Sequence, residues 1–251
     1  RQMQVKVPEV IYFEHYNELL QRSIMVTTEI KGRPIGQSSF LSEEVLHAIL
    51  VEAGRDLAHI NSIPVDGFGW IERDRLETEH LRLRAQRSAH HAFVLEDWDA
   101  DLAFLTGNVL RASERIHLEH VLSRYNSRLD VEQGYLAHGD FDTNHIYQEG
   151  GRYTGVIDFG EIRGASRWYD LGHFHVRDGE ALSYRGLPGL IQGYQERISL
   201  PSDYEQHIRF TSIFINVLAL ARSLQKRPAN RYTQLQLEVL REDLAALQLF
   251  L

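Results

Sequence analysis

Residues 137–161, AHGDFDTNHIYQEGGRYTGVIDFGE, constrain the fold of this chain more than any other stretch. Three aspartates, two histidines and an asparagine stand here among apolar residues, and an acidic group beside apolar surface needs a partner to offset its desolvation. The two glycines at 150–151 predict a turn between two apolar runs, and therefore a β-hairpin. Asp140 then lies in the loop before the first arm, and Asp158 lies at the end of the second.

A hairpin brings its open ends together, so we expect Asp140 and Asp158 to face one small volume. Two carboxylates in that arrangement provide the oxygen ligands that a divalent cation requires, and a cation so held can bind phosphate. An aspartate that only caps a turn is the alternative explanation at each position.

The composition narrows the class of protein. It is typical of a soluble globular chain, with 43% hydrophobic and 25% charged residues, and 251 residues suffice for a sizeable core. The net charge of −8 argues against nucleic acid as a partner, because phosphate binding needs clustered Lys and Arg. The chain has no cysteine, which excludes disulfides and thiolate metal sites and fits a cytoplasmic protein. The most apolar run, 210–221, is too short to cross a membrane and predicts a buried helix, so we expect no membrane partner.

The remaining pattern is that of a mostly helical α+β protein. Residues 9–14 and 23–30 have β-like composition, and the Gly- and Pro-containing stretch 31–36 is expected to be a linker. Ser42 predicts the N-cap of a helix. Apolar residues at helical spacing predict three buried helix faces: Val45, Ile49, Ala53 and Leu57; Leu118, Leu122, Tyr125 and Leu129; Leu240, Leu244, Leu247 and Leu251.

Three short motifs follow one another along the chain: HGD at 138–140, IDFG at 157–160 and WYDLGHF at 168–174. In this order and spacing they resemble the catalytic loop, the metal motif and the following segment of the aminoglycoside/hygromycin phosphotransferase-like kinases. GFGW at 67–70 and the region from VPEV at 7–10 to IMVTTEIKGRPI at 24–35 are similar to further landmarks of that family, so the resemblance covers nearly the whole chain.

The resemblance implies a protein-kinase-like α+β fold. Residues 36–251 would form a helical C-terminal lobe that carries the catalytic loop on a β-hairpin core. Residues 1–35 would be a remnant of the small β lobe together with the hinge. The oligomeric state is left open.

The same resemblance implies a role for each matching residue. Asp140 would be the catalytic aspartate, which orients the substrate hydroxyl or accepts its proton. Asp158 would hold the Mg²⁺ that bridges the nucleotide phosphates. His138 and Asp170 would brace the loop without taking part in the chemistry.

The second metal ligand departs from the family pattern. Five residues after Asp140 most members carry Asn, whereas this chain has His145, with Asn144 one position earlier. Mg²⁺ prefers hard oxygen ligands, so an imidazole is an unusual choice. Some aminoglycoside kinases are similar in carrying an Asn-His pair, so we assign His145 as the ligand and keep Asn144 as the alternative.

The nucleotide clamp of the family is incomplete in this sequence. No GxGxxG occurs, and none of the lysines, Lys6, Lys31 and Lys226, lies in an apolar strand that is followed by a helix with a glutamate partner. We expect that this part of the small lobe lies upstream of Arg1, with a natural remnant as the alternative. Exposed strand edges at the missing sheet would favour self-association.

The purine of ATP or GTP would meet the backbone of the hinge. The resemblance assigns this role to three consecutive residues: Thr28, Glu29 and Ile30.

The function implied by the resemblance is an ATP- and Mg²⁺-dependent phosphotransferase that acts on a hydroxyl of a small molecule. The Asn-His pair favours an aminoglycoside-type antibiotic and hence a role in antibiotic resistance. Asp142 and Glu161 are candidates for contact with a cationic sugar, or are simply solvated charges. A kinase-like binding module without activity is the main alternative, because half of the nucleotide clamp is absent.

A second alternative comes from another class of enzyme. The stretch DFDT at 140–143 matches the Asp-x-Asp-x-Thr signature of haloacid-dehalogenase-like phosphatases, in which the first aspartate attacks phosphorus. That signature normally follows a strongly apolar strand near the start of its domain, and it leaves the IDFG arm unexplained.

Overall fold

The computed structural model describes residues 5–72, 82–182 and 184–248. Its helices are α1 Glu43–Ile60, α2 His90–Val94, α3 Trp98–Asn108, α4 Ala112–Tyr125, α5 Tyr169–Arg177, α6 Leu187–Gln195, α7 Tyr204–Lys226 and α8 Arg231–Gln248. Its strands are β1 Val10–Asn17, β2 Arg22–Thr27, β3 Arg33–Pro34, β4 Pro64–Asp66, β5 Phe68–Ile71, β6 Leu83–Arg87, β7 Gly134–Ala137, β8 Ile146–Glu149, β9 Arg152–Val156 and β10 Arg163–Ala165. None of the helices in these ranges combines the length and hydrophobicity needed to span a bilayer.

The strands form three small sheets. β1 and β2 pair as an isolated antiparallel hairpin, β3, β8 and β9 form a three-stranded sheet, and β10, β5, β6, β4 and β7 close into a small barrel. The β-hairpin predicted within residues 137–161 is confirmed, because β8 pairs antiparallel with β9. Strand β7, which precedes Asp140, instead pairs with β4 and β10 in the barrel.

Helix α1 begins as its sequence predicts. Ser42 is the N-cap, and its side chain accepts a hydrogen bond from the backbone N–H of Val45 at 3.4 Å. Glu43 and Glu44 occupy the first turn, where negative charge complements the helix dipole. Most residues of the three predicted apolar faces are buried, while Val45 of α1 and Leu122 of α4 are partly buried. Leu251, the last residue of the third face, lies outside the described residues.

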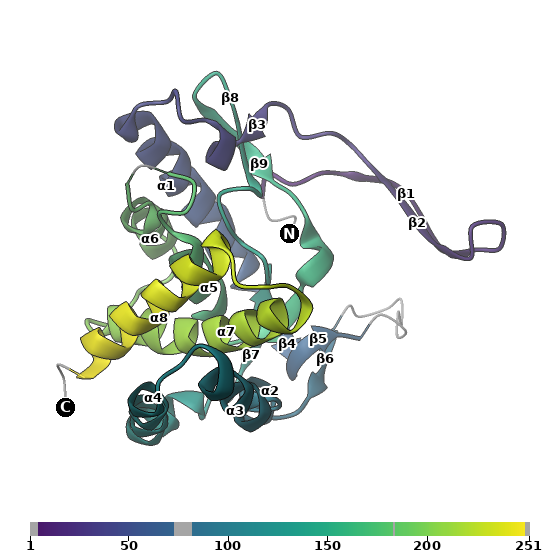
Figure 1. Ribbon diagram of the computed structural model, residues 1–251. Coiled ribbons are helices and arrows are strands. Elements are labelled where there is room, and N and C mark those ends of the chain that lie inside the picture. Colours follow the sequence, from purple (N-terminus) through teal and green to yellow (C-terminus); the bar gives the residue numbers. More distant parts are fainter. Residues whose placement is uncertain (1–4, 73–81, 183, 249–251) are drawn as a thin grey trace.

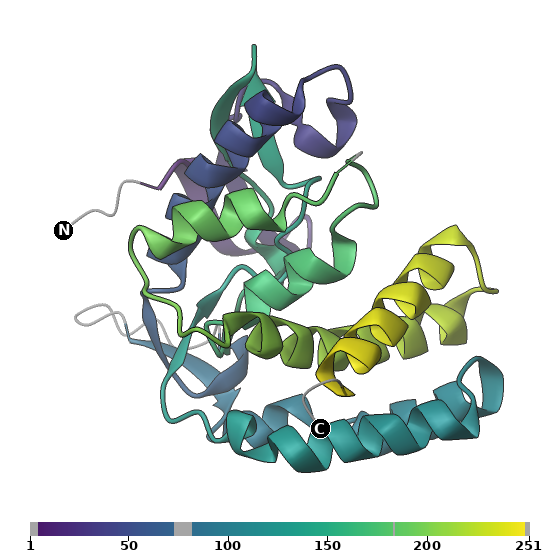
Figure 2. The ribbon, with the colours of Figure 1, turned by 90° about the vertical axis from the view of Figure 1, so that its left-hand side faces the viewer.

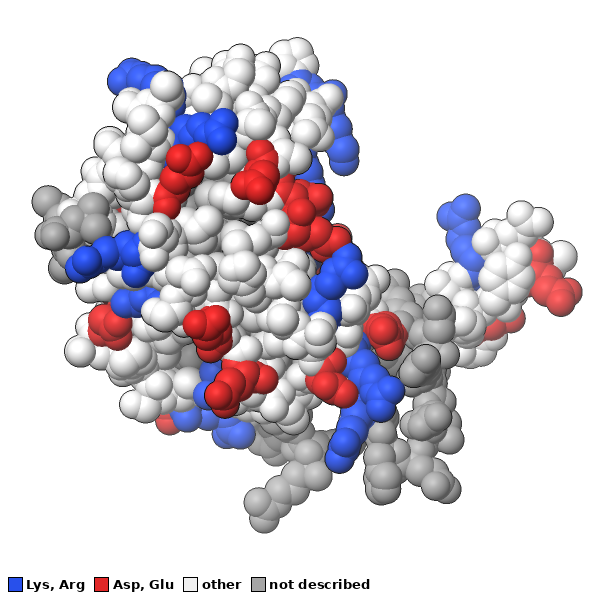
Figure 3. Space-filling model, turned by 90° about the horizontal axis from the view of Figure 1, so that it is seen from below, with Lys and Arg blue, Asp and Glu red and all other residues white. Residues whose placement is uncertain are grey.

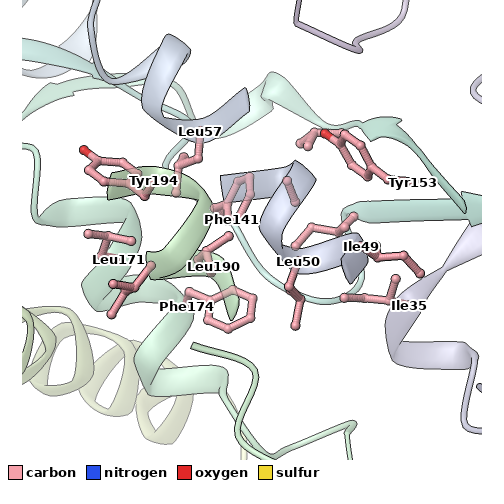
Figure 4. Close-up of a cluster of buried hydrophobic side chains, with 14 of the residues drawn as sticks. Ile35, Ile49, Leu50, Leu57, Phe141, Tyr153, Leu171, Phe174, Leu190 and Tyr194 are labelled. Carbon is pink, nitrogen blue, oxygen red and sulfur yellow. The ribbon is translucent and has the colours of Figure 1, made fainter. Parts of the chain in front are cut away.

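The helices bury two separate hydrophobic clusters. The first joins α1, α5 and α6 to the β8–β9 sheet, and the side chain of Phe141 lies among these apolar residues (Figure 4). The second lies between α3, α4, α7 and α8, which Figure 2 shows on the opposite side of the molecule from α1. A buried polar contact joins the two halves, since His175 of α5 lies 2.9 Å from Asp243 of α8. The catalytic loop candidate lies on the first of these clusters.

The prediction of a linker at 31–36 is wrong for residues 33–35. Arg33 and Pro34 form β3 and pair with β8, and Ile35 is fully buried. Proline lacks a backbone N–H, and it is accepted in a sheet only at an edge such as this one. Gly and Pro look the same in sequence whether they form a loop or an edge strand.

The β1–β2 hairpin projects away from the rest of the molecule (Figure 1). Large apolar side chains are exposed on it, including Ile11 at 66% and Leu19 at 94%. Thr28 closes the base of the hairpin, because its backbone N–H donates to the carbonyl of Glu9 at 2.9 Å. This hairpin therefore contributes little to the two hydrophobic clusters.

Helices α1 and α6 approach so closely that glycine is required at their crossing. A Cβ at Gly193 would lie 1.8 Å from the carbonyl oxygen of Val51. We predict that Gly193→Ala lowers the free energy of unfolding by about 3 kcal/mol or more, because backbone must move to admit the methyl group. Urea unfolding followed by circular dichroism measures the change.

Gly107 in α3 provides the matched control, because a Cβ there meets no atom within 4 Å. Gly107→Ala should leave stability equal or raise it by about 0.5 kcal/mol, as alanine favours the helix. Equal unfolding midpoints for the two variants would contradict the close crossing.

Candidate active site

Asp170 holds the backbone of the HGD loop in place. It is fully buried at the start of α5, and its carboxylate accepts the backbone N–H groups of His138 and Gly139, both at 2.9 Å. The side-chain amide of Asn61 donates to the same carboxylate at 2.8 Å. These hydrogen bonds satisfy the buried carboxylate, which forms no ion pair with any residue that the structure describes. Asp170 thus fixes the two residues that precede Asp140.

Gly139 permits the sharp turn into Asp140. Its φ is +87°, and a Cβ would lie 1.9 Å from the carbonyl oxygen of Glu161. Only glycine adopts this conformation without strain and leaves room for the neighbouring backbone. The HGD loop and the segment after IDFG are therefore in direct contact.

The ring of His138 joins the HGD loop to the IDFG segment. Its Nε2 lies 2.9 Å from the carbonyl of Ile157, and its Nδ1 accepts the backbone N–H of Asp140 at 3.3 Å. Burial lowers the pKa of His138, which favours the neutral ring that donates from Nε2 and accepts at Nδ1. His138 thus contacts both the carbonyl of Ile157 and the backbone of Asp140, and its bracing role stays a prediction.

Asp140 and Asp158 approach opposite sides of one imidazole ring. Asp140 Oδ2 lies 3.9 Å from Nδ1 of His145, and Asp158 Oδ2 lies 3.7 Å from its Nε2. The carbonyl oxygen of Asp140 lies 2.7 Å from Nδ1 and accepts a hydrogen bond from it, so the tautomer with its hydrogen on Nδ1 has the Nε2 lone pair on the side of Asp158. The structure thus brings these three predicted residues together.

Asp158 has an unusual backbone conformation for a residue with a side chain. Its φ is +67°, in the left-handed region, and Oδ1 accepts the N–H of Gly160 at 3.3 Å. Its side chain remains 58% exposed. A local hydrogen bond of this kind lets Asp adopt a conformation that most residues avoid. The second oxygen stays open toward His145 and solvent.

His173 lies in the WYDLGHF motif, but no role in the site was predicted for it from the sequence. Its Nε2 lies 3.4 Å from Oδ1 of Asp140, and its Nδ1 lies 3.3 Å from the carbonyl of Phe141. Burial lowers the pKa of His173, which favours a neutral ring beside the carboxylate. The available signal was its helical spacing, because His173 follows Asp170 by three residues and lies on the same face of α5.

Asp142 occupies a different environment from the one expected of a substrate contact. It is 2% exposed, and its carboxylate lies 3.4 Å from Arg177 and accepts the N–H of Asn144 at 2.7 Å. The structure therefore places Asp142 beneath the loop. The phosphatase alternative loses its proton shuttle for the same reason, because that role requires the second aspartate to reach the substrate.

Asp140, Asp142 and His145 offer ligand atoms that lie within 4.8 Å of one another. Asp142 is already paired with Arg177, and Nδ1 of His145 is engaged with a carbonyl, so this trio is poorly suited to a metal ion. The side-chain oxygen of Asn144 faces Gly36, 3.0 Å from the position of a Cβ there. Nε2 of His145 with the carboxylate of Asp158 is the better donor set.

Glu161 and an unexpected arginine lie beside the loop. Arg163 is 6% exposed and donates to the carboxylate of Glu161 at 2.9 Å and to its carbonyl at 3.0 Å. The guanidinium also lies over the ring of Trp70, 4.5 Å from its centroid. One carboxylate oxygen of Glu161 is thus occupied, while half of its side chain remains exposed.

The hinge residues differ from one another in their free backbone groups. The N–H of Thr28 donates to Glu9, and its hydroxyl accepts the N–H of Glu9 at 2.8 Å. Within the described ranges, no backbone hydrogen bond is found for Glu29 or Ile30. Lys6 contacts Glu52 at 2.8 Å, on α1, and is not in this site.

Comparisons with known proteins show the family and the fold of this chain. A sequence profile of the phosphotransferase enzyme family matches residues 1–207. A thermostable mutant of aminoglycoside phosphotransferase APH(4)-Ia is 16% identical, with a TM-score of 0.64 over 98% of this chain and 79% of that one. A fructosamine-3-kinase-like protein of Thermobifida fusca is 17% identical, with a TM-score of 0.63 over 99% and 75%. These likenesses show a kinase-like α+β fold.

Two further matches complete the comparison. The GDP and kanamycin complex of APH(2″)-IIIa is 16% identical, with a TM-score of 0.64 over 97% of this chain and 77% of that one. In sequence, GTPase Obg of Streptococcus thermophilus is 29% identical over 70 residues, which is 28% of this chain. The chain covers 16% of the length of that curated relative.

We predict that Asp170→Ala destabilises the protein strongly, because it leaves two buried backbone N–H groups without an acceptor and removes one of the two acceptors of the Asn61 amide. The free energy of unfolding should fall by roughly 3–5 kcal/mol. Urea unfolding measures it, with exposed Asp130→Ala as the control that should change stability little. A loss below about 1 kcal/mol for Asp170→Ala would show that the loop does not depend on these bonds.

Proposed function

The chain belongs to the phosphotransferase enzyme family, and on that premise we propose that it transfers the terminal phosphoryl group of ATP or GTP to a hydroxyl of a small cationic molecule. As a member of that family it is a small-molecule phosphotransferase. The proposal depends above all on one observation: the carboxylates of Asp140 and Asp158 lie at opposite nitrogens of the His145 ring, on a loop fixed by Asp170.

Asp140 is assigned to orient the substrate hydroxyl. Its side chain is 35% exposed, so it reaches solvent where an acceptor would lie. Transfer of a phosphoryl group through a loose transition state asks for positioning more than for strong basicity. Contacts with His145 and His173 on either side restrict the directions in which the carboxylate can point.

Asp158 and His145 are assigned to hold Mg²⁺, and the donor set fits. Asp158 supplies an exposed carboxylate oxygen, and the hydrogen bond at Nδ1 of His145 leaves the Nε2 lone pair directed to the same space. When bound, the ion would neutralise charge on the nucleotide phosphates. Glu29 and Ile30 are assigned to the purine, because their backbone groups are open among the described residues.

A groove beside the catalytic loop supports a cationic acceptor. It has a volume of about 260 Å³ and lies between the end of α5 and α8. Arg177 and Tyr232 line it and lie near Asp140, whose negative charge adds to the effects of burial and of Glu180 in raising the pKa of Tyr232. Four acidic residues line the groove against two arginines: Asp178, Glu180, Glu238 and Glu242.

The acidic excess favours an amine-bearing hydroxyl compound over an anionic one. Similar folds were solved with hygromycin B and with kanamycin, which agrees with this class of acceptor. Glu161, half exposed beside the loop, is a further candidate for contact with it. A role in antibiotic resistance and the dependence on Mg²⁺ belong to the same proposal.

We predict that Asp140→Asn lowers the rate of phosphoryl transfer at least 100-fold, because the amide cannot accept the hydroxyl proton. Transfer of label from γ-labelled ATP and GTP to aminoglycosides and to anionic sugars of similar size measures the rate. Asp130→Asn is the control and should retain full activity. A correctly folded chain with no transfer to any acceptor would favour the inactive binding module instead.

We predict that Asp158→Asn weakens Mg²⁺-dependent nucleotide binding about tenfold or more, because it removes the open carboxylate. His145→Gln should weaken it less if Nε2 is one ligand among several. Calorimetric titration of nucleotide with and without Mg²⁺ measures both. Unchanged Mg²⁺ dependence in Asp158→Asn would contradict its assignment as a ligand.

A further inference from the structure

A second cavity lies away from the HGD loop. Its volume is about 110 Å³, and it lies between β5 and β6, helices α2 and α3, and helix α7, at the lower side of the molecule in Figure 1. Neither Asp140 nor Asp158 lines it. Its size suits a small molecule built on a single ring.

Aromatic side chains form most of the apolar wall of this cavity. They include Trp70, Phe93, Trp98, Trp168, Phe210 and Phe214. The rings brace one another, with Trp98 and Phe214 at a centroid distance of 5.0 Å and Phe210 and Phe214 also at 5.0 Å. Trp168 stacks on His207 at 4.5 Å. The wall therefore presents ring faces and edges held in fixed positions.

Asp101 is an unpaired acid in the same cavity. It is 8% exposed, and in the described part of the chain its carboxylate has no hydrogen bond and no ion pair within 4.0 Å. Burial raises the pKa of Asp101, and the charge of Asp97 adds to this effect, while Arg222 opposes it from a greater distance. Asp101 lies in the first turn of α3, where the helix dipole offers its carboxylate only a partial positive charge. A buried carboxylate without a partner is unfavourable, so its presence here points to a cationic ligand.

Most of the other charges around the cavity already have partners. Three arginines in its wall are paired: the exposed Arg87 with Glu96, the half-buried Arg128 with Asp203 at 2.7 Å, and the buried Arg163 with Glu161 at 2.9 Å. Arg222 and Asp97 are exposed to solvent at its rim. Within the described ranges Asp101 is thus an acid of the cavity wall with no ion pair within 4.0 Å, and Arg222, the cation that attracts it, is exposed at the rim.

We propose that this cavity binds a small organic ammonium ion with an aromatic or compact apolar frame, and that Asp101 is its counter-ion. Aromatic faces attract cations through their quadrupole, and the carboxylate adds a charge-assisted hydrogen bond to an ammonium N–H. A neutral ring would fill the space but leave the carboxylate unpaired. An anion would meet Asp101 directly and be repelled.

Three probes of nearly equal shape test the proposal: benzylammonium, benzyl alcohol and benzoate. Calorimetry and tryptophan fluorescence of the full chain at neutral pH measure binding. We expect benzylammonium to bind at least tenfold more tightly than benzyl alcohol, and benzoate to bind more weakly than either. Asp101→Asn should reduce benzylammonium to the affinity of benzyl alcohol, whereas the exposed neighbour variant Asp99→Asn should change neither.

Binding should also be independent of the phosphotransferase site. Asp140→Asn is expected to leave the affinity for benzylammonium unchanged, so that failure of the proposed catalytic function and failure of this proposal are separate results. Equal binding of the cation and the alcohol, or no effect of Asp101→Asn, would overturn the assignment.

The stability of the unliganded variant provides a second measurement. Asp101→Asn removes an uncompensated buried charge, so its unfolding midpoint should equal or exceed that of the natural chain. A clearly lower midpoint would mean that Asp101 already has a structural partner, and that the cavity needs no cationic ligand.

Discussion

The site depends first on the carboxylate of Asp170. This side chain is fully buried, and it accepts the N–H groups of two consecutive residues, His138 and Gly139. Backbone groups in a turn have no partners of their own, and a buried turn is stable only when another group satisfies them. Asp170 does so from the first turn of α5 and thereby fixes the direction in which the chain enters Asp140.

The loop also receives support from the hydrophobic cluster around α1. Phe141 follows Asp140 directly, and its fully buried side chain lies among α1, α5 and α6 (Figure 4). Asp140 is thus held between a hydrogen-bonded turn on one side and a packed aromatic ring on the other. Such support restricts a catalytic group to a narrow set of orientations, which is what phosphoryl transfer requires of it.

The charged groups around the catalytic loop are arranged differently from those on the surface. Acidic and basic side chains are interspersed on the face shown in Figure 3, whereas the loop collects carboxylates beside histidine rings. His138 and His173 have pKa values lowered by burial, which favours neutral rings beside Asp140. Asp101 instead lies in a wall rich in aromatic rings, with no ion pair within 4.0 Å among the described residues, and this environment differs from that of the loop carboxylates.

The sequence by itself determined the elements whose signals are local. Helical spacing gave the buried faces of α1 and α4, Ser42 marked a helix start, and the two glycines at 150–151 marked the β8–β9 turn. The order of HGD, IDFG and WYDLGHF indicated which residues would meet. These features depend on neighbours within a few positions, so they can be read from a single chain.

Only the tertiary structure decided what depends on distant contacts. Asp140 and Asp142 look equivalent in sequence. In the structure Asp142 is buried and pairs with Arg177 on α5, whereas the side chain of Asp140 is partly exposed. Residues Arg33 and Pro34 became an edge strand because β8 was there to pair with them. His173 beside Asp140, and Asp101 in its aromatic cavity, acquired their surroundings from separate helices and strands. Burial and pairing are properties of the packed molecule, and a residue type does not specify them.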